Sequence, residues 1–159
     1  MHLRNLTDVR RRNLNSFFCL LVFGIATCGA AIAQYRPTGG PTPSPPGAEV
    51  YFVDVKDGQH IPAKAVIHFS LRNMGVAPAG SDQANSGHHH LLIDSALSGD
   101  ELKQPIAMDD THRHFGAGQT EALITLPPGQ HKLQLVLGDW SHIPHRPPVM
   151  SNVITVTVR

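Results

Sequence analysis

The chain has 159 residues and a formal net charge of +1, with 13 Lys and Arg, 12 Asp and Glu and 11 histidines counted as neutral. This length suits one ordinary domain, and the small net charge excludes the strongly basic surface of a nucleic-acid-binding protein. The two cysteines, Cys19 and Cys28, both lie near the N-terminus, so the sequence also excludes a disulfide-rich scaffold.

The first 33 residues have the pattern of an export signal. Arginines precede an apolar stretch, and the small residues Ala31-Ile32-Ala33 form a cleavage site. The apolar stretch is short for a membrane span, and no later segment approaches 18 consecutive apolar residues. We therefore expect a periplasmic or secreted protein without a membrane span after the signal is removed. A twin-arginine signal at Arg11-Arg12 and a lipoprotein site at Cys28 stay open as alternatives.

The chain after the signal is slightly acidic. Residues 1–33 contain four of the 13 basic residues and one of the 12 acidic residues, so the remainder has two more acidic than basic residues. Residues 34–48 are rich in proline and glycine and show no apolar periodicity. We predict a signal at 1–33, a linker at 34–48 and one folded domain at 49–159.

Apolar and polar residues alternate in short runs after residue 49, which is typical of β-strands. In the run 64–72, Ala65, Ile67, Phe69 and Leu71 form one apolar face. Strands are predicted at 49–55, 64–72, 88–94, 111–115, 121–126, 131–137 and 152–158, and one helical turn at 98–103. These strands favour an all-β fold, an immunoglobulin-like antiparallel β-sandwich, with a small β-barrel as the alternative.

The histidines gather at one end of the predicted sandwich. In this fold, the loops before the third strand and after the sixth strand lie at the same end. The residues expected there are His88, His89, His90, His114, His142 and His145. Because side chains alternate along a strand, His88 and His90 share one face, whereas His89 points with Leu91 and Ile93 toward the core.

This arrangement predicts a transition-metal site. Neutral imidazole is a good ligand for zinc and copper near pH 7. The predicted ligands of copper or zinc are His88, His90, His114, His142 and His145. His112 is expected to hydrogen-bond its own loop instead, and the methionines, including Met108, are either Cu(I) ligands or simple packing residues.

Two other classes of function compete with a metal-binding module. The first is a module whose loops bind a glycan, a peptide or another cell-envelope protein, with the histidines as hydrogen-bond donors. The second is a metal-dependent enzyme, for which the available carboxylates are Asp109, Asp110, Glu121 and Asp139. No catalytic motif accompanies them, so we predict no catalytic residues and rank the enzyme third.

Three long segments resemble a known family. They are GHHHLLID at 87–94, the stretch from Asp109 to Asp139, and HIPHRPPVMSNVITVTV at 142–158. Together they are similar to a bacterial family of exported domains described as domain of unknown function 4399, and the resemblance covers Val50 to Val158. It implies a small exported β-domain and supplies no catalytic residues.

Overall fold

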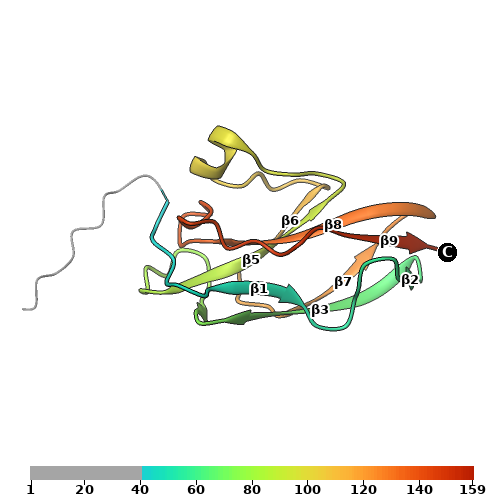
Figure 1. The fold of residues 1–159 in the computed structure, drawn as a ribbon, viewed down its shortest axis with the longest axis horizontal. Coiled ribbons are helices and arrows are strands. Elements are labelled where there is room, and N and C mark those ends of the chain that lie inside the picture. Colours follow the sequence, from blue (N-terminus) through green and yellow to red (C-terminus); the bar gives the residue numbers. More distant parts are fainter. Residues whose placement is uncertain (1–40) are drawn as a thin grey trace, which may run out of the picture. The chain divides into compact units, whose positions relative to one another are not determined.

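The computed structural model describes residues 41–159, which form two β-sheets packed face to face (Figure 1). The predicted signal and the beginning of the predicted linker lie outside the described residues. The smaller sheet has the order β1 (Glu49–Phe52), β3 (Lys64–Arg72), β7 (Glu121–Thr125). The larger sheet has the order β2 (His60–Ile61), β9 (Ile154–Val158), β8 (Gly129–Gly138), β5 (Ser86–Ile93), β4 (Gly75–Val76), with β6 (His112–Phe115) also paired to β5. Across 41–159, no helix is both long enough and apolar enough to cross a membrane.

The predicted sandwich is confirmed, and the barrel alternative is wrong because the two sheets do not close on each other. All seven predicted strands are present, with ends shifted by up to three residues. The first ends at Phe52 rather than at residue 55, because the carboxylate of Asp54 accepts a hydrogen bond from the amide of His68 at 3.1 Å and so replaces a backbone partner. The strands β2 and β4 were not predicted, since two residues are too few to show a periodicity.

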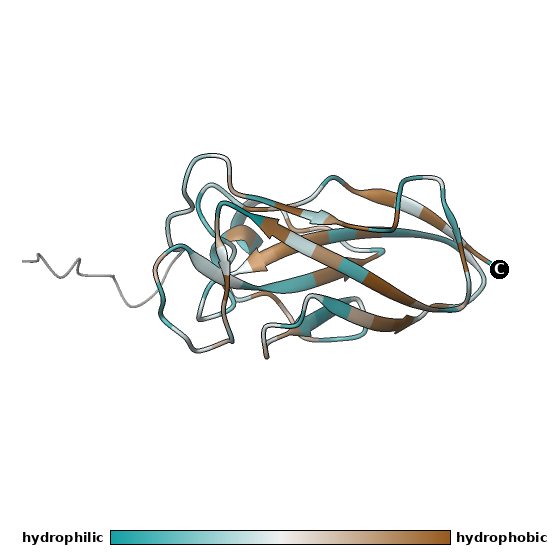
Figure 2. Ribbon diagram, turned by 90° about the horizontal axis from the view of Figure 1, so that it is seen from below, coloured by the Kyte–Doolittle hydropathy of each residue, from teal (hydrophilic) through white to brown (hydrophobic). Residues whose placement is uncertain are grey.

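The core lies between the sheets and follows the alternation along the strands. In β3, Ala65, Ile67 and Phe69 are buried, whereas Val66 and His68 between them are exposed. Figure 2 shows the resulting apolar bands along the strands. The largest fully buried apolar side chains are Ile67, Phe69, Leu91, Leu92, Leu133, Leu135 and Leu137. Burial of their apolar surface is the main force that holds the sheets together.

Strand β5 is buried on both faces, and this property positions the site described below. One face packs into the core, and the other is covered by the segment that runs from residue 94 to 111. That segment contains the short helix η1 (Gly99–Lys103) and lies on the side of β5 and β8 away from β1 and β3 (Figure 1). It is held there because Ile106 forms a second apolar cluster with Leu92 and Val136.

His89 points into the core, as predicted. Its side chain is fully buried, its ring centroid is 4.7 Å from that of Phe69, and its Nδ1 lies 3.2 Å from the carbonyl oxygen of Gln119. Burial lowers the pKa of His89 from 6.5 to about 4, and the contact with Gln119 offsets only part of this effect. The fold therefore holds His89 as a neutral residue at physiological pH.

We expect acid to destabilise the fold in part through His89. Between about pH 6.5 and pH 4, the unfolded chain binds a proton at this residue that the folded protein does not bind, so the free energy of unfolding falls as the pH drops through this range. The full contribution of His89 is about 3 kcal/mol. Urea unfolding of wild type and His89→Gln at pH 7 and pH 4.5 measures it. The variant should lose less stability than wild type, and an equal loss in both proteins would contradict this account.

Candidate metal centre

Four histidines meet on the outer face of the larger sheet, beneath the covering segment. They are His88, His90, His114 and His142, and one ring nitrogen from each lies within 4.8 Å of the others. The Nε2 of His88 lies 3.0 Å from the Nε2 of His90 and 3.1 Å from the Nδ1 of His142. The ring centroids of the four residues are 4.8 to 6.0 Å apart. We call this group the four-histidine cluster.

Strand pairing places three members of the cluster. His88 and His90 are two residues apart on β5 and therefore share its outer face. His90 stands directly opposite His114 in the antiparallel pair of β5 and β6, so their side chains project on the same side of the sheet. His88 is opposite Gly138, the last residue of β8. The cluster thus lies where β5 begins and β8 ends, and the prediction from alternation is confirmed for these residues.

His142 reaches the cluster through a tight turn built by Asp139. The Oδ1 atom of Asp139 accepts hydrogen bonds from the amides of Ser141 and Ile143 at 2.9 and 3.0 Å. Within this turn His142 has a φ of 69°, a left-handed conformation that non-glycine residues adopt infrequently. The carbonyl of His142 accepts a hydrogen bond from the amide of Ile106 at 2.9 Å, which ties the turn to the covering segment. Strained backbone held by several bonds is typical of functional sites.

Two glycines leave the space that the imidazoles occupy. A Cβ atom on Gly138 would stand 2.8 Å from the Nε2 of His90, and a Cβ atom on Gly116 would stand 2.5 Å from the Nε2 of His114. Neither glycine has a positive φ that would require glycine for backbone reasons. Their lack of a side chain therefore serves the packing of the histidine rings.

The cluster is buried at its base and open toward the surface. His88 and His90 are 0% exposed, whereas His114 and His142 are partly exposed. In the part of the chain that the structure describes, the Nδ1 atoms of His88 and His90 and the Nε2 of His114 are buried without a hydrogen-bond partner. Each such atom costs about 1–3 kcal/mol when it is left unpaired. The arrangement is therefore poorly explained by folding stability alone.

Burial and electrostatics disfavour protonation of the inner imidazoles of the cluster. Burial, together with repulsion from other histidines of the cluster, lowers the pKa of His88 to about 4 and that of His90 to about 2. Burial and the proximity of His142 also lower the pKa of His114. Neutral imidazoles offer lone pairs, which are what a metal ion requires of a ligand.

The spacing of the nitrogens fits metal coordination. A tetrahedral ion with metal–nitrogen bonds of 2.0–2.1 Å has ligand atoms about 3.3 Å apart. The two short separations at His88, 3.0 and 3.1 Å, are close to this value. Between residues 41 and 159, the group of donor atoms contains imidazoles and no carboxylate.

The fifth predicted ligand, His145, lies outside the four-histidine cluster. It is buried, and its Nδ1 is 2.8 Å from the hydroxyl of Thr42. The reason is that residues 42–44 run alongside this loop: the amide of Arg146 donates a hydrogen bond to the carbonyl of Thr42 at 2.8 Å. From the sequence, residues 34–48 were predicted to be a linker. A contact between this segment and His145 was therefore not expected, and His145 was assigned to the metal site instead.

Two histidines outside the cluster have ordinary structural contacts, and for His112 this was predicted. His112 lies 3.0 Å from the hydroxyl of Ser95 and 2.9 Å from the carboxylate of Asp109. His131 lies 2.7 Å from the carboxylate of Asp94. Burial lowers the pKa of His131, but this hydrogen bond and one to the carbonyl of Pro127 raise it overall.

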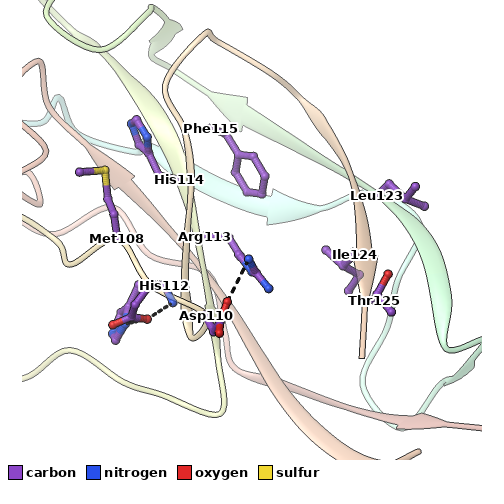
Figure 3. Close-up of a pocket in the computed structure, with 10 residues that line it drawn as sticks. Met108, Asp110, His112, Arg113, His114, Phe115, Leu123, Ile124 and Thr125 are labelled. Carbon is purple, nitrogen blue, oxygen red and sulfur yellow. Dashed lines mark hydrogen bonds and ion pairs between the residues drawn. The ribbon is translucent and has the colours of Figure 1, made fainter. Parts of the chain in front are cut away.

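A depression of about 720 Å³ borders the cluster between the free edges of β6 and β7. Figure 3 shows the side chains of Arg113 and Phe115 on the side of β6 that faces Leu123, and those of Met108 and His114 on the opposite side. Three of the carboxylates considered for an enzyme pair with other side chains: Asp109 with His112, Asp110 with Arg113 at 3.5 Å, and Glu121 with His68 at 3.2 Å. The fourth, Asp139, bonds its own turn through Oδ1, and its Oδ2 is buried without a hydrogen-bond partner among residues 41–159.

We predict that Gly116→Ala moves the ring of His114 out of the four-histidine cluster, because the new methyl group would overlap that ring. Nuclear Overhauser contacts between the imidazole protons of His114 and His88 should disappear. Gly75→Ala is the matched control, since a Cβ atom there meets nothing closer than 3.8 Å and the φ of Gly75 is not positive. Retention of the His114 contacts in Gly116→Ala would show that this glycine does not position the ring.

Comparison with known proteins gives a family and no function. Neither the curated proteins nor the solved structures gave a match. The sequence profile of one family matches residues 67–159, which is more than half of the chain and includes all four members of the cluster. The resemblance predicted from the sequence is thereby confirmed, and the chain belongs to the family described as Domain of unknown function (DUF4399).

Proposed function

We propose that the protein is a binding module for a transition metal, copper or zinc, and that His88, His90, His114 and His142 are the ligands. The observation that carries the proposal is the convergence of four imidazoles, one ring nitrogen of each lying within 4.8 Å of the others. Hydrogen bonding accounts poorly for this convergence. The Nε2 of His88 lies within hydrogen-bonding distance of the Nε2 of His90 and the Nδ1 of His142, but the Nδ1 atoms of His88 and His90 and the Nε2 of His114 stay buried and unpaired among residues 41–159. A bound ion would use the lone pairs that now face one another.

The surroundings of the cluster support a prearranged site. Two ligands are fixed on one strand, a third is fixed on its neighbour, and the fourth is fixed by the Asp139 turn. Ligands held by packing and by hydrogen bonds lose little entropy when they bind a metal. His145 is not among the proposed ligands, since it lies outside the cluster.

If all four imidazoles bind a tetrahedral ion, no coordination position is left open, which favours holding or transferring the ion over hydrolysis. A hydrolytic metal site needs a general base near an open coordination position. We therefore propose buffering, delivery or sensing of the metal. From the signal predicted at residues 1–33, we propose that this role is carried out in the periplasm or outside the cell, with a cell-envelope protein or a glycan as a further partner.

Purified protein, expressed from the full-length chain and kept free of chelators, is expected to bind close to one equivalent of metal. Titration with Zn(II) and with Cu(II) against a competing dye measures the stoichiometry and the affinity. Removal of two ligands in His88→Ala/His90→Ala should weaken binding on the order of 100-fold or more, since loss of even a hydrogen-bonding partner of a ligand costs 10–100-fold.

Two further variants test whether the loss of binding is specific to the proposed ligands. His142→Asn removes a ligand that is only partly buried and keeps a residue type that tolerates the left-handed backbone, so the fold should survive while binding weakens. His60→Ala changes an exposed histidine that lies outside the cluster and should bind as wild type does. The proposal is overturned if wild type takes up neither ion more tightly than about micromolar, or if His142→Asn binds as wild type does.

A further inference from the structure

The donor atoms of the four-histidine cluster carry no negative charge. They are all imidazole nitrogens, and in the region from 41 to 159 no carboxylate oxygen joins them. The nearest carboxylate along the chain is that of Asp139: its Oδ1 accepts hydrogen bonds from the amides of its own turn, and its Oδ2 is buried without a hydrogen-bond partner in that region. An ion bound by the four imidazoles alone would therefore keep its full charge at a site whose two inner ligands, His88 and His90, are 0% exposed.

The charge of the ion then decides how well it fits this site. The cost of moving an ion from water into a poorly solvated site rises with the square of its charge. Among residues 41–159, none of the ligand atoms of the cluster carries a negative charge that would offset this cost. A monovalent ion is penalised about one quarter as much as a divalent one. Among the ions that imidazole binds well, Cu(I) is the monovalent one.

A soft side chain lies at the open side of the cluster. Met108 is 64% exposed, lines the same depression as His114, and projects on the same side of β6 as His114 (Figure 3). The methionines Met74 and Met150 instead pack against buried clusters. Thioether sulfur binds Cu(I) in preference to hard divalent ions.

We propose that the cluster selects copper in its monovalent state, and that Met108 captures the ion at the surface and passes it to His114. This inference rests on the proposed function and assigns the ion that the site takes. The ion is bound as Cu(I) throughout, so the transfer from sulfur to imidazole requires no oxidant or reductant. His114 is the first histidine reached because it is partly exposed and borders the depression.

The affinity test uses protein expressed from the full-length chain under anaerobic conditions. Cu(I) is titrated in competition with bathocuproine disulfonate, and Zn(II) in competition with a zinc dye. We expect one equivalent of Cu(I), bound at least about 100-fold more tightly than Zn(II). Zinc binding that equals or exceeds Cu(I) binding overturns this inference and leaves the proposed function intact, whereas binding of neither ion overturns both.

The kinetic test concerns Met108. Met108→Leu removes the sulfur and keeps the apolar volume, so Cu(I) loading in stopped flow should slow about tenfold while Zn(II) loading and the final Cu(I) affinity stay as in wild type. Met150→Leu is the matched control, because Met150 packs against the cluster formed by Leu92, Ile106 and Val136. Loading of Cu(I) at the wild-type rate, or equal slowing of both ions, overturns the role given to Met108.

Discussion

Burial of β5 on both faces is the constraint on which the rest of the structure depends. A strand in a sandwich normally presents one face to the core and the other to water. In β5 both faces are covered, the inner one by the smaller sheet and the outer one by the segment that carries Ile106. Three consecutive histidines on this strand are therefore fully buried, and strand alternation assigns them to two different environments.

The two environments have different physical consequences. His89 is a single neutral imidazole against Phe69, and it behaves as a polar core residue with an acid-dependent cost. His88 and His90 face other imidazoles instead, and burial together with repulsion from neighbouring imidazoles lowers the pKa of both. The close packing of imidazoles that disfavours protonation also brings their nitrogen lone pairs together. Within three adjacent residues, this contrast distinguishes one structural histidine, His89, from two proposed ligands, His88 and His90.

The strands and the faces on which His88 and His90 lie were predictable from the sequence, because they depend on alternation. The period of two along β3 and β5 is visible in the order of the residues, and it correctly placed His88 and His90 on one face and His89 on the other. The glycines Gly116 and Gly138 were also visible, but their role depends on which rings lie against them, and that contact joins different strands.

The loops were less predictable, because their conformation depends on single hydrogen bonds. Nothing in the sequence pattern shows that Asp139 bonds the amides of its own turn and so directs His142 inward. Likewise, nothing in a proline-rich segment shows that Thr42 lies beside His145. His142 and His145 are three residues apart and looked equivalent in the sequence. The structure separates them through partners that are distant along the chain.

X-ray absorption spectroscopy of the metal-loaded protein tests the central claim most directly, because it counts the imidazoles bound to the ion. The claim is that β5, β6 and the Asp139 turn bring four imidazoles to one ion. We expect a first shell of three or four nitrogens at about 2.0 Å with the multiple scattering of imidazole rings. A first shell dominated by oxygen, or one without imidazole scattering, would contradict the claim and would mean that the four-histidine cluster has another role.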